Sequence, residues 1–465
     1  MGEPLWTSDE VVRATGGALA GAAFTATGVS IDTRTITPGD LFIALADVRD
    51  GHDFVPAALA KGAAGVLVSK PVEGPSIVVG DSLRALERLG EAAQLRAPQV
   101  RRGAVTGSVG KTSVTQAIRA GLEAAGRAHG SVKSYNNHIG VPLTLARMPR
   151  DTERAIFEVG MNHAGEITPL VRMVQPRAVA ITTVAPVHIE NFADGEAGVA
   201  RAKAEIFQGL QPGGRAVLNA DNAWFEFLRR EAEAQGAEVV AFGTGGDCAA
   251  QLADFRLEGE GAVVEARLHG APVRFTLRQA GAHWGLMSLA ALLMMEALDT
   301  PLAAGLQALA DFAPLEGRGA ERLVRVAGGA ITLIDESYNA NPLSVAAALR
   351  TLGLRQPSNR RIAVLTDMLE LGPESDAYHA GLAAEIEAAK VDLVFSAGPR
   401  MKSLWEALPP TRRGAYAETA EALAPSLIRA VEPGDLVMVK GSRDSRAKAL
   451  FEALAALDVP SGEAA

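Results

Sequence analysis

The chain is poor in features that mark secreted and nucleic-acid-binding proteins. Among its 465 residues it has one cysteine, Cys248, so no disulfide can form within the chain. This use of cysteine fits a reducing compartment. Lysine and arginine number 45 against 54 aspartate and glutamate, and the net charge of −9 disfavours an electrostatic footprint for DNA or RNA. We therefore expect a cytoplasmic protein with no nucleic-acid partner.

Long hydrophobic runs are also missing. The most apolar segment, 286–298 (LMSLAALLMMEAL), is interrupted by Glu296 and is too short to cross a bilayer. We interpret it as a buried helix and expect no stable insertion into a membrane. The first residues, MGEPLWTSDEVVRATGG, lack a basic stretch followed by an apolar one, so we expect no signal peptide.

Apolar residues are nevertheless plentiful. They make up 48% of the chain, enough to fill more than one core, and the length corresponds to about three domains. Strand and helix patterns alternate in the way that α/β proteins require. We predict a small α/β N-terminal domain over 1–99, a central P-loop domain with a doubly wound sheet over 100–314, and a Rossmann-like C-terminal domain over 315–465.

Short apolar runs bounded by Gly, Pro and Asp predict the strands. In the first domain these runs lie at 41–45, 64–69 and 76–80, and a helix with Asp81 as N-cap follows over 81–97. Buried parallel strands are expected in the central domain at 154–160, 178–184 and 214–220, with antiparallel additions at 237–243, 255–270 and 272–279. A second alternation predicts strands at 330–337, 361–368, 391–398 and 435–442.

The segment AVTGSVGKTSVTQAI (104–118) indicates a phosphate-binding loop between a strand and a helix. It departs from the usual G-x-x-x-x-G-K-[ST] pattern, because the position five before Gly110 is Val105. The glycines allow a tight turn whose N–H groups face a phosphate. Lys111 would meet the outer phosphates, and the Thr112 hydroxyl would meet Mg²⁺. An ordinary strand–turn–helix joint is the alternative, and kinases, GTPases and ligases all use such loops.

Two further side chains follow neighbouring strands, where an α/β sheet binds its ligands. Glu158 ends one apolar run, and His188 lies just beyond the next. A carboxylate and an imidazole there would suit a second divalent ion, although each residue alone is a weak signal. Lys203, in AGVARAKAEIF, is an unexpected neighbour because an ammonium group repels a metal.

Taken together, these motifs resemble the Mur ligases of bacterial cell-wall synthesis. The shared features are the short loop T-G-S-V-G-K-T, Glu158, His188 and KAEIF. Within the family, the chain is most similar to ligases that join D-alanyl-D-alanine to UDP-N-acetylmuramoyl tripeptide. The segments that carry this similarity are SIDTRTITPGDLFIALADVRDGHDF (30–54), SYNNHIGVPLTL (134–145), EVGMNHAGEI (158–167), DESYNANPLSVAAAL (335–349), DMLELG (367–372) and KGSR (440–443).

The resemblance implies the cofactors and the residues that hold them. ATP and two Mg²⁺ ions are expected in the central domain, with Lys203 carried as a carbamate that can hold or orient around Mg²⁺. The implied nucleotide contacts are Gly107, Ser108, Gly110, Lys111, Thr112, His283, Arg318 and, at the ribose, Asp335. The implied metal ligands are Thr112, Glu158, His188 and carbamylated Lys203. The implied catalytic residues are Lys111, Glu158, His188 and Lys203.

The resemblance also implies the substrates and the reaction. An acyl phosphate formed on the tripeptide carboxylate would be attacked by the amine of D-alanyl-D-alanine, giving the UDP-N-acetylmuramoyl pentapeptide that is a peptidoglycan precursor. We expect a monomer that closes over UDP-muramoyl tripeptide and dipeptide by hinges near 99–102 and 313–319. The implied contacts are Asp32, Arg34 and His52 for the UDP-sugar, Asn136 and Asn137 on a substrate-side loop, Tyr338, Asn339 and Asn341 where the C-terminal domain closes, and Lys440 and Arg443 for the dipeptide carboxylate.

One departure and three alternatives remain. The family often has G-R-H-N-x-x-N where this chain has GAHWGLM (281–287), so amide contacts to adenine stay open and Trp284 could offer an apolar or a stacking surface. The ligase that adds the third amino acid typically carries a D-N-P-R signature, which is not found here. Folylpolyglutamate synthase shares the architecture, but the DGHDF segment argues against it. A P-loop switch would leave Lys203 and His188 unexplained.

Overall fold

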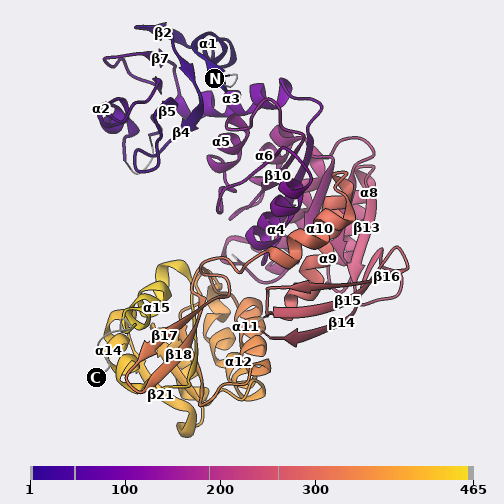
Figure 1. Cartoon of the computed structure of the whole chain (residues 1–465), viewed down its shortest axis with the longest axis vertical. Coiled ribbons are helices and arrows are strands. Elements are labelled where there is room, and N and C mark those ends of the chain that lie inside the picture. Colours follow the sequence, from indigo (N-terminus) through magenta and orange to yellow (C-terminus); the bar gives the residue numbers. More distant parts are fainter. Residues whose placement is uncertain (1–3, 47–48, 188, 260, 459–465) are drawn as a thin grey trace.

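The computed structural model describes residues 4–46, 49–187, 189–259 and 261–458. They form three α/β domains that lie along an arc, with the N-terminal domain at one end and the C-terminal domain at the other (Figure 1). The predicted three-domain architecture is thus confirmed, while the residue boundaries stay predictions. No helix within the described residues is long and apolar enough to cross a membrane.

The N-terminal domain contains a five-stranded sheet in which β2 alone is antiparallel to its neighbour. In spatial order its strands are β2 (Ala18–Ala20), β7 (Ser76–Val78), β6 (Gly65–Val68), β5 (Asp40–Ile43) and β4 (Gly28–Ser30). β1 (Trp6–Thr7) and β3 (Thr25–Ala26) pair separately. The helices are α1 (Ser8–Thr15), α2 (Val55–Ala60) and α3 (Ser82–Leu95). The expected N-cap is confirmed, because the Asp81 carboxylate accepts from the N–H groups of Leu83 and Arg84.

The central sheet has nine strands. In spatial order they are β16 (Ala271–Leu277), β15 (Gly261–Leu268), β14 (Ala250–Glu258), β13 (Glu238–Gly243), β12 (Arg215–Asn219), β11 (Ala178–Ile181), β8 (Arg101–Thr106), β10 (Arg154–Glu158) and β9 (Ala128–Gly130). The antiparallel interpretation is right for the β14–β15 and β15–β16 pairs. It is wrong for β13, which is parallel to β12 and β14. The chain reaches β13 through helix α8 (Phe225–Ala234), a crossover that returns it in the original direction.

Helices cover both faces of the central sheet. The side chains of β8 alternate between the two cores, with Ala104 in one and Val105 in the other. One face carries α5 (Gly140–Ala146), α6 (Ile167–Val174), α7 (Glu196–Ala204) and α8, and the other carries α4 (Lys111–Ala124), α9 (His283–Ala297) and α10 (Leu302–Asp311). The apolar segment 286–298 lies almost entirely in α9, whose side chains are largely buried, so its interpretation as a buried helix is confirmed.

The C-terminal domain is a second doubly wound sheet, with β17 antiparallel and the rest parallel. In spatial order its strands are β17 (Ala320–Val326), β18 (Gly329–Glu336), β22 (Leu436–Lys440), β19 (Arg361–Thr366), β20 (Leu393–Ala397) and β21 (Arg413–Ala417). One face packs against α11 (Pro342–Leu354), α12 (Ser375–Ala388) and α13 (Met401–Ala407), and the other against α14 (Ala420–Ala430) and α15 (Ala447–Ala455). All four strands predicted for this domain are present.

The N-terminal and central domains share a core. Leu143 and Ala146 of α5 belong to the same buried cluster as Leu86 and Leu89 of α3. The Trp6 indole N–H donates to the Ala146 carbonyl at 2.8 Å. The junction near residues 99–102 therefore lies beside a packed interface, which restricts its use as a hinge.

We predict that Leu143→Ala destabilises the protein by about 2–5 kcal/mol, because it leaves a cavity in that shared core. Urea-induced unfolding would measure the loss. Leu302→Ala is the control, since Leu302 is largely exposed on α10. Equal stability of the two variants would contradict a shared core.

Candidate active site

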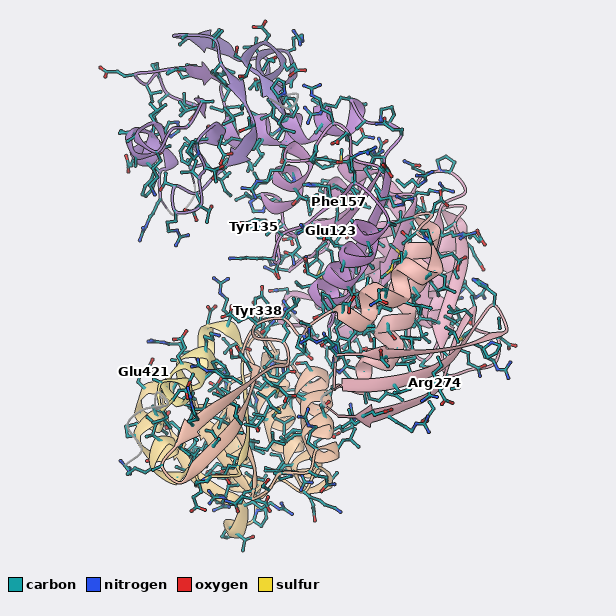
Figure 2. All side chains as sticks on the ribbon, in the orientation of Figure 1. Glu123, Tyr135, Phe157, Arg274, Tyr338 and Glu421 are labelled. Carbon is teal, nitrogen blue, oxygen red and sulfur yellow. The ribbon has the colours of Figure 1, made fainter. Side chains whose placement is uncertain are left out.

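A cavity of about 720 Å³ lies at the carboxyl edge of the central sheet. β8, β10 and β11 are parallel and in register, so Val105, Glu158 and Ala180 stand side by side near that edge. The far wall comes from the C-terminal domain, where Tyr338 lies on the side facing the central domain (Figure 2). Most of the predicted residues line this cavity, namely Ser108, Gly110, Lys111, Thr112, Asn136, Glu158, His283, Arg318, Tyr338, Asn339, Asn341 and Lys440.

The loop after β8 has the backbone that the sequence predicts. Gly107 has φ +147°, and a Cβ there would lie 1.9 Å from the Thr182 hydroxyl oxygen, so only glycine fits. Gly110, with φ +84°, begins helix α4. The Ser108 hydroxyl donates to the Ala185 carbonyl and accepts from the Ala185 N–H, both at 3.0 Å. The free N–H groups of the first helical turn thus face the cavity, which is the arrangement that binds phosphate.

Lys111 folds back over this loop. Its Nζ donates to the Gly107 carbonyl at 2.7 Å. Burial lowers the pKa of Lys111, with Glu158 opposing the shift and Arg318 adding to it. A cation held this way can exchange one carbonyl for the oxygens of an incoming phosphate.

Glu158 carries an unsatisfied buried oxygen. Its side chain is fully buried, and its Oε1 accepts from the Asn136 amide at 2.7 Å. Its Oε2 has no hydrogen-bond partner, which is costly for a buried carboxylate. Nearby in the cavity wall, the hydroxyls of Thr112 and Ser134 are hydrogen-bonded at 2.9 Å. These oxygens are the type that Mg²⁺ prefers, so they fit the predicted ion.

The second predicted ion has less support. His188, one of the predicted ligands, lies outside the described residues. Within the described ranges, no group of three His, Cys, Asp or Glu side chains could hold a metal. Lys203, near the end of α7, is only 3% exposed. Burial, reinforced by the charge of Lys111, lowers the pKa of Lys203 well below its usual value, which favours a neutral amine.

Arg318 reaches from the segment before β17 into the phosphate loop. Its guanidinium donates to the Thr112 hydroxyl at 3.0 Å and to the Ser134 hydroxyl at 3.3 Å. It also lies 3.9 Å from the centre of the Tyr338 ring, a cation–π contact. Arg318 thus bridges the central domain and the residues around β18.

The residues at the start of α9 form an apolar wall. His283 lines the cavity, as expected. Trp284 also lines it but is 4% exposed, and its ring packs against Phe312 with centroids 5.7 Å apart. Most of the indole therefore belongs to the core, which leaves little of the ring for stacking, while its place in the cavity wall agrees with the apolar surface that was the other expectation.

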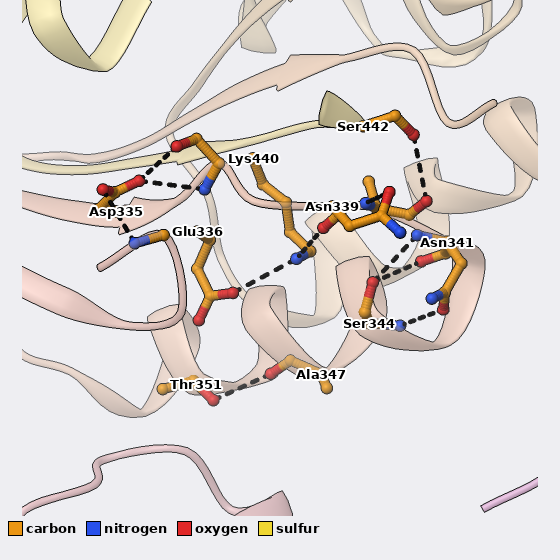
Figure 3. A network of polar contacts seen from close by, with 12 residues as sticks. Asp335, Glu336, Asn339, Asn341, Ser344, Ala347, Thr351, Lys440 and Ser442 are labelled. Carbon is orange, nitrogen blue, oxygen red and sulfur yellow. Dashed lines mark hydrogen bonds and ion pairs between the residues drawn. The ribbon is translucent and has the colours of Figure 1, made fainter. Parts of the chain in front are cut away.

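On the C-terminal side, the predicted polar residues bind one another (Figure 3). Lys440 Nζ donates to Glu336 at 3.3 Å and to the Asn339 carbonyl at 3.0 Å. Asn341 is the N-cap of α11 and forms a capping box with Ser344. Asp335 is buried and does not line the cavity; its oxygens accept from Gly317, Ser337 and Lys448.

The remaining predicted residues lie away from the cavity. Asn137 accepts from the N–H groups of Ile139 and Gly140, and Arg443 is exposed. In the N-terminal domain, Arg34 pairs with Asp32 at 2.6 Å. Both ring nitrogens of His52 are engaged, Nδ1 by Asp50 at 2.5 Å and Nε2 by the Ser69 N–H at 2.9 Å.

The structure also adds cavity residues that the motifs missed. Ser134, Asn219, Asp221, Asn222 and Arg350 all line the cavity. Asn219 ends β12, the next strand along the same edge after β11. The end of the predicted strand at 214–220 therefore could have indicated Asn219 as a cavity residue. Arg350 lies mid-helix in α11 and had no comparable signal.

Three family models match successive parts of the chain. They are the Mur ligase family catalytic domain at residues 25–109, the Mur ligase middle domain at 105–295, and the Mur ligase glutamate ligase domain at 321–443. The order of these matches agrees with the order of the three domains described above.

Similar proteins are aligned over nearly the whole chain. The UDP-N-acetylmuramoyl-tripeptide–D-alanyl-D-alanine ligase of Escherichia coli K12 is 34% identical over 446 residues, which cover 94% of this chain and 96% of that protein. The ligase of the same name from Rickettsia prowazekii is 31% identical, covering 89% and 92%. A crystal structure of MurF from Acinetobacter baumannii superposes with a TM-score of 0.84 at 26% identity, covering 98% and 99%. By these matches, the chain belongs to the Mur ligase family.

Proposed function

We propose that this chain is an ATP-dependent ligase that joins D-alanyl-D-alanine to UDP-N-acetylmuramoyl tripeptide. The observation that carries the proposal is one cavity that combines a phosphate-binding loop, a buried carboxylate oxygen without a partner, and polar groups from a second domain. The relatives named for this reaction match the chain over most of its length. The product would be the UDP-N-acetylmuramoyl pentapeptide of peptidoglycan synthesis, made in the cytoplasm.

Amide formation from a carboxylate needs activation, because a carboxylate is a poor electrophile. We propose that the tripeptide carboxylate attacks the γ-phosphorus of ATP to form an acyl phosphate and ADP, and that the dipeptide amine then displaces phosphate. The N–H groups after Gly110 and the Lys111 ammonium would bind the phosphates and offset the repulsion between two anions. Mg²⁺ held by Thr112 and Glu158 would add charge stabilisation on the phosphate oxygens.

The proposal gives each domain one substrate. We assign UDP-sugar binding to 1–99 through Asp32, Arg34 and His52, ATP to 100–314, and dipeptide binding to 315–465 in a monomer. Arg34 has the clearest support, because its side chain is largely exposed and Asp32 orients it. His52 would act by holding its loop, since both of its ring nitrogens already have partners.

The C-terminal contacts would form when that domain closes. Lys440 lines the cavity and could exchange Glu336 for the dipeptide carboxylate. Arg443 is exposed beyond it, and Asn339 and Tyr338 stand on the same wall. The adenine ring and ribose would lie between α9 and α11, near His283, with Asp335 reached only after a rearrangement.

A direct assay would test the reaction. Purified protein is incubated with ATP, Mg²⁺, D-alanyl-D-alanine and a UDP-muramoyl tripeptide ending in either meso-diaminopimelate or lysine, and the pentapeptide is detected by mass. ATP hydrolysis that depends on both peptide substrates supports the ligase. Hydrolysis that needs neither would favour a P-loop switch, and product from a free diamino acid would favour the ligase for the third residue.

We predict that Lys111→Ala lowers the turnover number by about a hundredfold or more, because a preorganised charge on the transferring phosphoryl group is lost. The KM values for the two peptide substrates should change much less. Steady-state kinetics would measure both, with Lys402→Ala as the control because Lys402 is exposed on α13. Near-normal turnover of Lys111→Ala would remove the assignment of the phosphate loop.

Lys203 is proposed to act as a carbamate. A neutral amine attacks CO₂, an N–C bond forms, and a proton is released, which leaves an anion where an ammonium would repel Mg²⁺. The burial of Lys203 and its lowered pKa support this chemistry. The alternative is a buried lysine that only packs the end of α7.

We predict that Lys203→Ala is folded but nearly inactive, whereas Lys402→Ala keeps full activity. With ¹³C-labelled bicarbonate, the unsubstituted protein should show a carbamate resonance that Lys203→Ala lacks. Formate or acetate would restore part of the activity by filling the vacated anion position. Full activity of Lys203→Ala, or activity that persists after complete removal of CO₂ and bicarbonate, would exclude the carbamate.

A further inference from the structure

Asp335 is the most heavily engaged carboxylate around the hinge segment 313–319. Asp335 lies near the end of β18, and only 1% of its surface is exposed. Its Oδ1 accepts from the Ser337 N–H at 3.1 Å and from the Ser337 hydroxyl at 2.5 Å. Its Oδ2 accepts from the Gly317 N–H at 3.1 Å and from Lys448 Nζ at 3.0 Å. One buried anion thus binds the hinge and the last helix together, and Figure 3 shows Asp335 within the polar network of this domain.

Lys448 supplies the only charged partner of this carboxylate among the described residues. Its Nζ also contacts Glu316 at 2.8 Å, but the Glu316 side chain is 83% exposed, so solvent screens that pair. The pair with Asp335 is far less screened, because that carboxylate is buried. The Lys448 Nζ also lies 4.7 Å from the centre of the Phe451 ring of α15, a cation–π contact that helps to hold the amine in place.

The anchored residue, Gly317, fixes the geometry of the next one. Gly317 has φ +73°, and a Cβ there would lie 2.9 Å from the Cβ of Tyr338. Its carbonyl accepts from the Tyr338 N–H at 3.2 Å. The backbone is therefore held on both sides just before Arg318. That side chain crosses to Thr112 and Ser134 of the central domain.

We propose that Lys448 is a positioning residue for nucleotide binding: through Asp335 and Gly317 it sets the place of Arg318 at the phosphate loop. This inference rests on the proposed function for the nucleotide site and adds a residue from the far end of the chain to it. Lys448 does not touch the cavity. It acts by keeping the hinge backbone in the one conformation that delivers the guanidinium to the Thr112 hydroxyl.

The negative charge of the buried Asp335 explains why a lysine suits position 448. The Gly317 and Ser337 donors satisfy the carboxylate partly, but a buried anion gains most from a cationic donor. Without Lys448, solvent or a rotated side chain would have to replace the fourth hydrogen bond. Gly317 would then lose a fixed acceptor, and Arg318 would sample positions away from the loop.

The test uses the full chain and a titration with Mg·ADP, which needs no peptide substrate. Lys448→Ala should weaken Mg·ADP binding about tenfold, the effect of one charge-assisted hydrogen bond, and Arg318→Ala should weaken it at least as much. The double variant should bind no more weakly than Arg318→Ala, because Lys448 acts through Arg318. Lys448→Arg should restore binding, and Glu316→Gln is the control that should leave it unchanged.

Two results would overturn the proposal. One is an additive double variant, which would mean that Lys448 acts independently of Arg318. The other is unchanged Mg·ADP affinity in Lys448→Ala. If Lys448→Ala lacks a native melting transition, Lys448→Met, which keeps the length of the side chain and removes its charge, takes its place in the cycle. Absence of Mg·ADP binding by the unsubstituted protein would instead overturn the proposed function.

Discussion

Burial of charge at the carboxyl edge of the central sheet is the constraint on which the site depends. Lys111 lies near the buried carboxylate of Glu158, and Lys203, which is 3% exposed, lies within the electrostatic reach of Lys111. Burial penalises each charged form, and two ammonium groups disfavour each other. The pKa values of both lysines are lowered because burial disfavours their charged forms. Anionic phosphates would relieve this cost of burial at Lys111, and a cation would relieve it at the unpartnered oxygen of Glu158, so the proposed site would favour a metal-bound polyphosphate over either component alone.

The glycine loop makes this arrangement possible because it removes side chains where the backbone must turn. Thr182 of the neighbouring segment lies so close to Gly107 that no Cβ fits. Ser108 is tied to Ala185 after the same strand. The loop is therefore held by two strands before any ligand arrives, and little conformational entropy remains to be lost on binding.

Arg318 links this preformed site to the C-terminal domain. Its guanidinium donates to the hydroxyl of Thr112, the residue expected to meet Mg²⁺. A side-chain cation thus stands beside the oxygens that an ion would use. Arrival of Mg²⁺ with a nucleotide would turn the guanidinium from Thr112 toward the phosphates, while the hinge backbone stays anchored through Gly317 and Asp335. The N-terminal junction is less free to move, since α5 is packed in the core of both domains.

The fold and many of the residues that line the cavity could be predicted from the sequence, for identifiable physical reasons. Buried parallel strands are continuous apolar runs, and glycine, lysine and threonine at fixed spacing specify the loop, so β8, α4 and Lys111 could be predicted. β13 could not be oriented, because a short half-buried strand has the same pattern in either direction and only the crossover through α8 decides. The choice between an apolar and a stacking role for Trp284 could not be made from the sequence, because its burial depends on Phe312, which is distant in sequence. Lys448 carried no signal at all, since its partner Asp335 is 113 residues away.

The polar residues of the C-terminal wall line the cavity but are hydrogen-bonded to one another. Lys440 is satisfied by Glu336 and the Asn339 carbonyl, and Asn341 caps its own helix. Each of these groups therefore has a hydrogen-bond partner before any substrate arrives. A substrate carboxylate that replaces Glu336 at Lys440 exchanges one ion pair for another, and the net free energy of that exchange is small. Under the proposed role of Lys440, selection among substrates would depend on which carboxylate reaches Lys440 in the geometry that α11 and β22 fix. A ligand of the wrong length would leave Lys440 bound to Glu336.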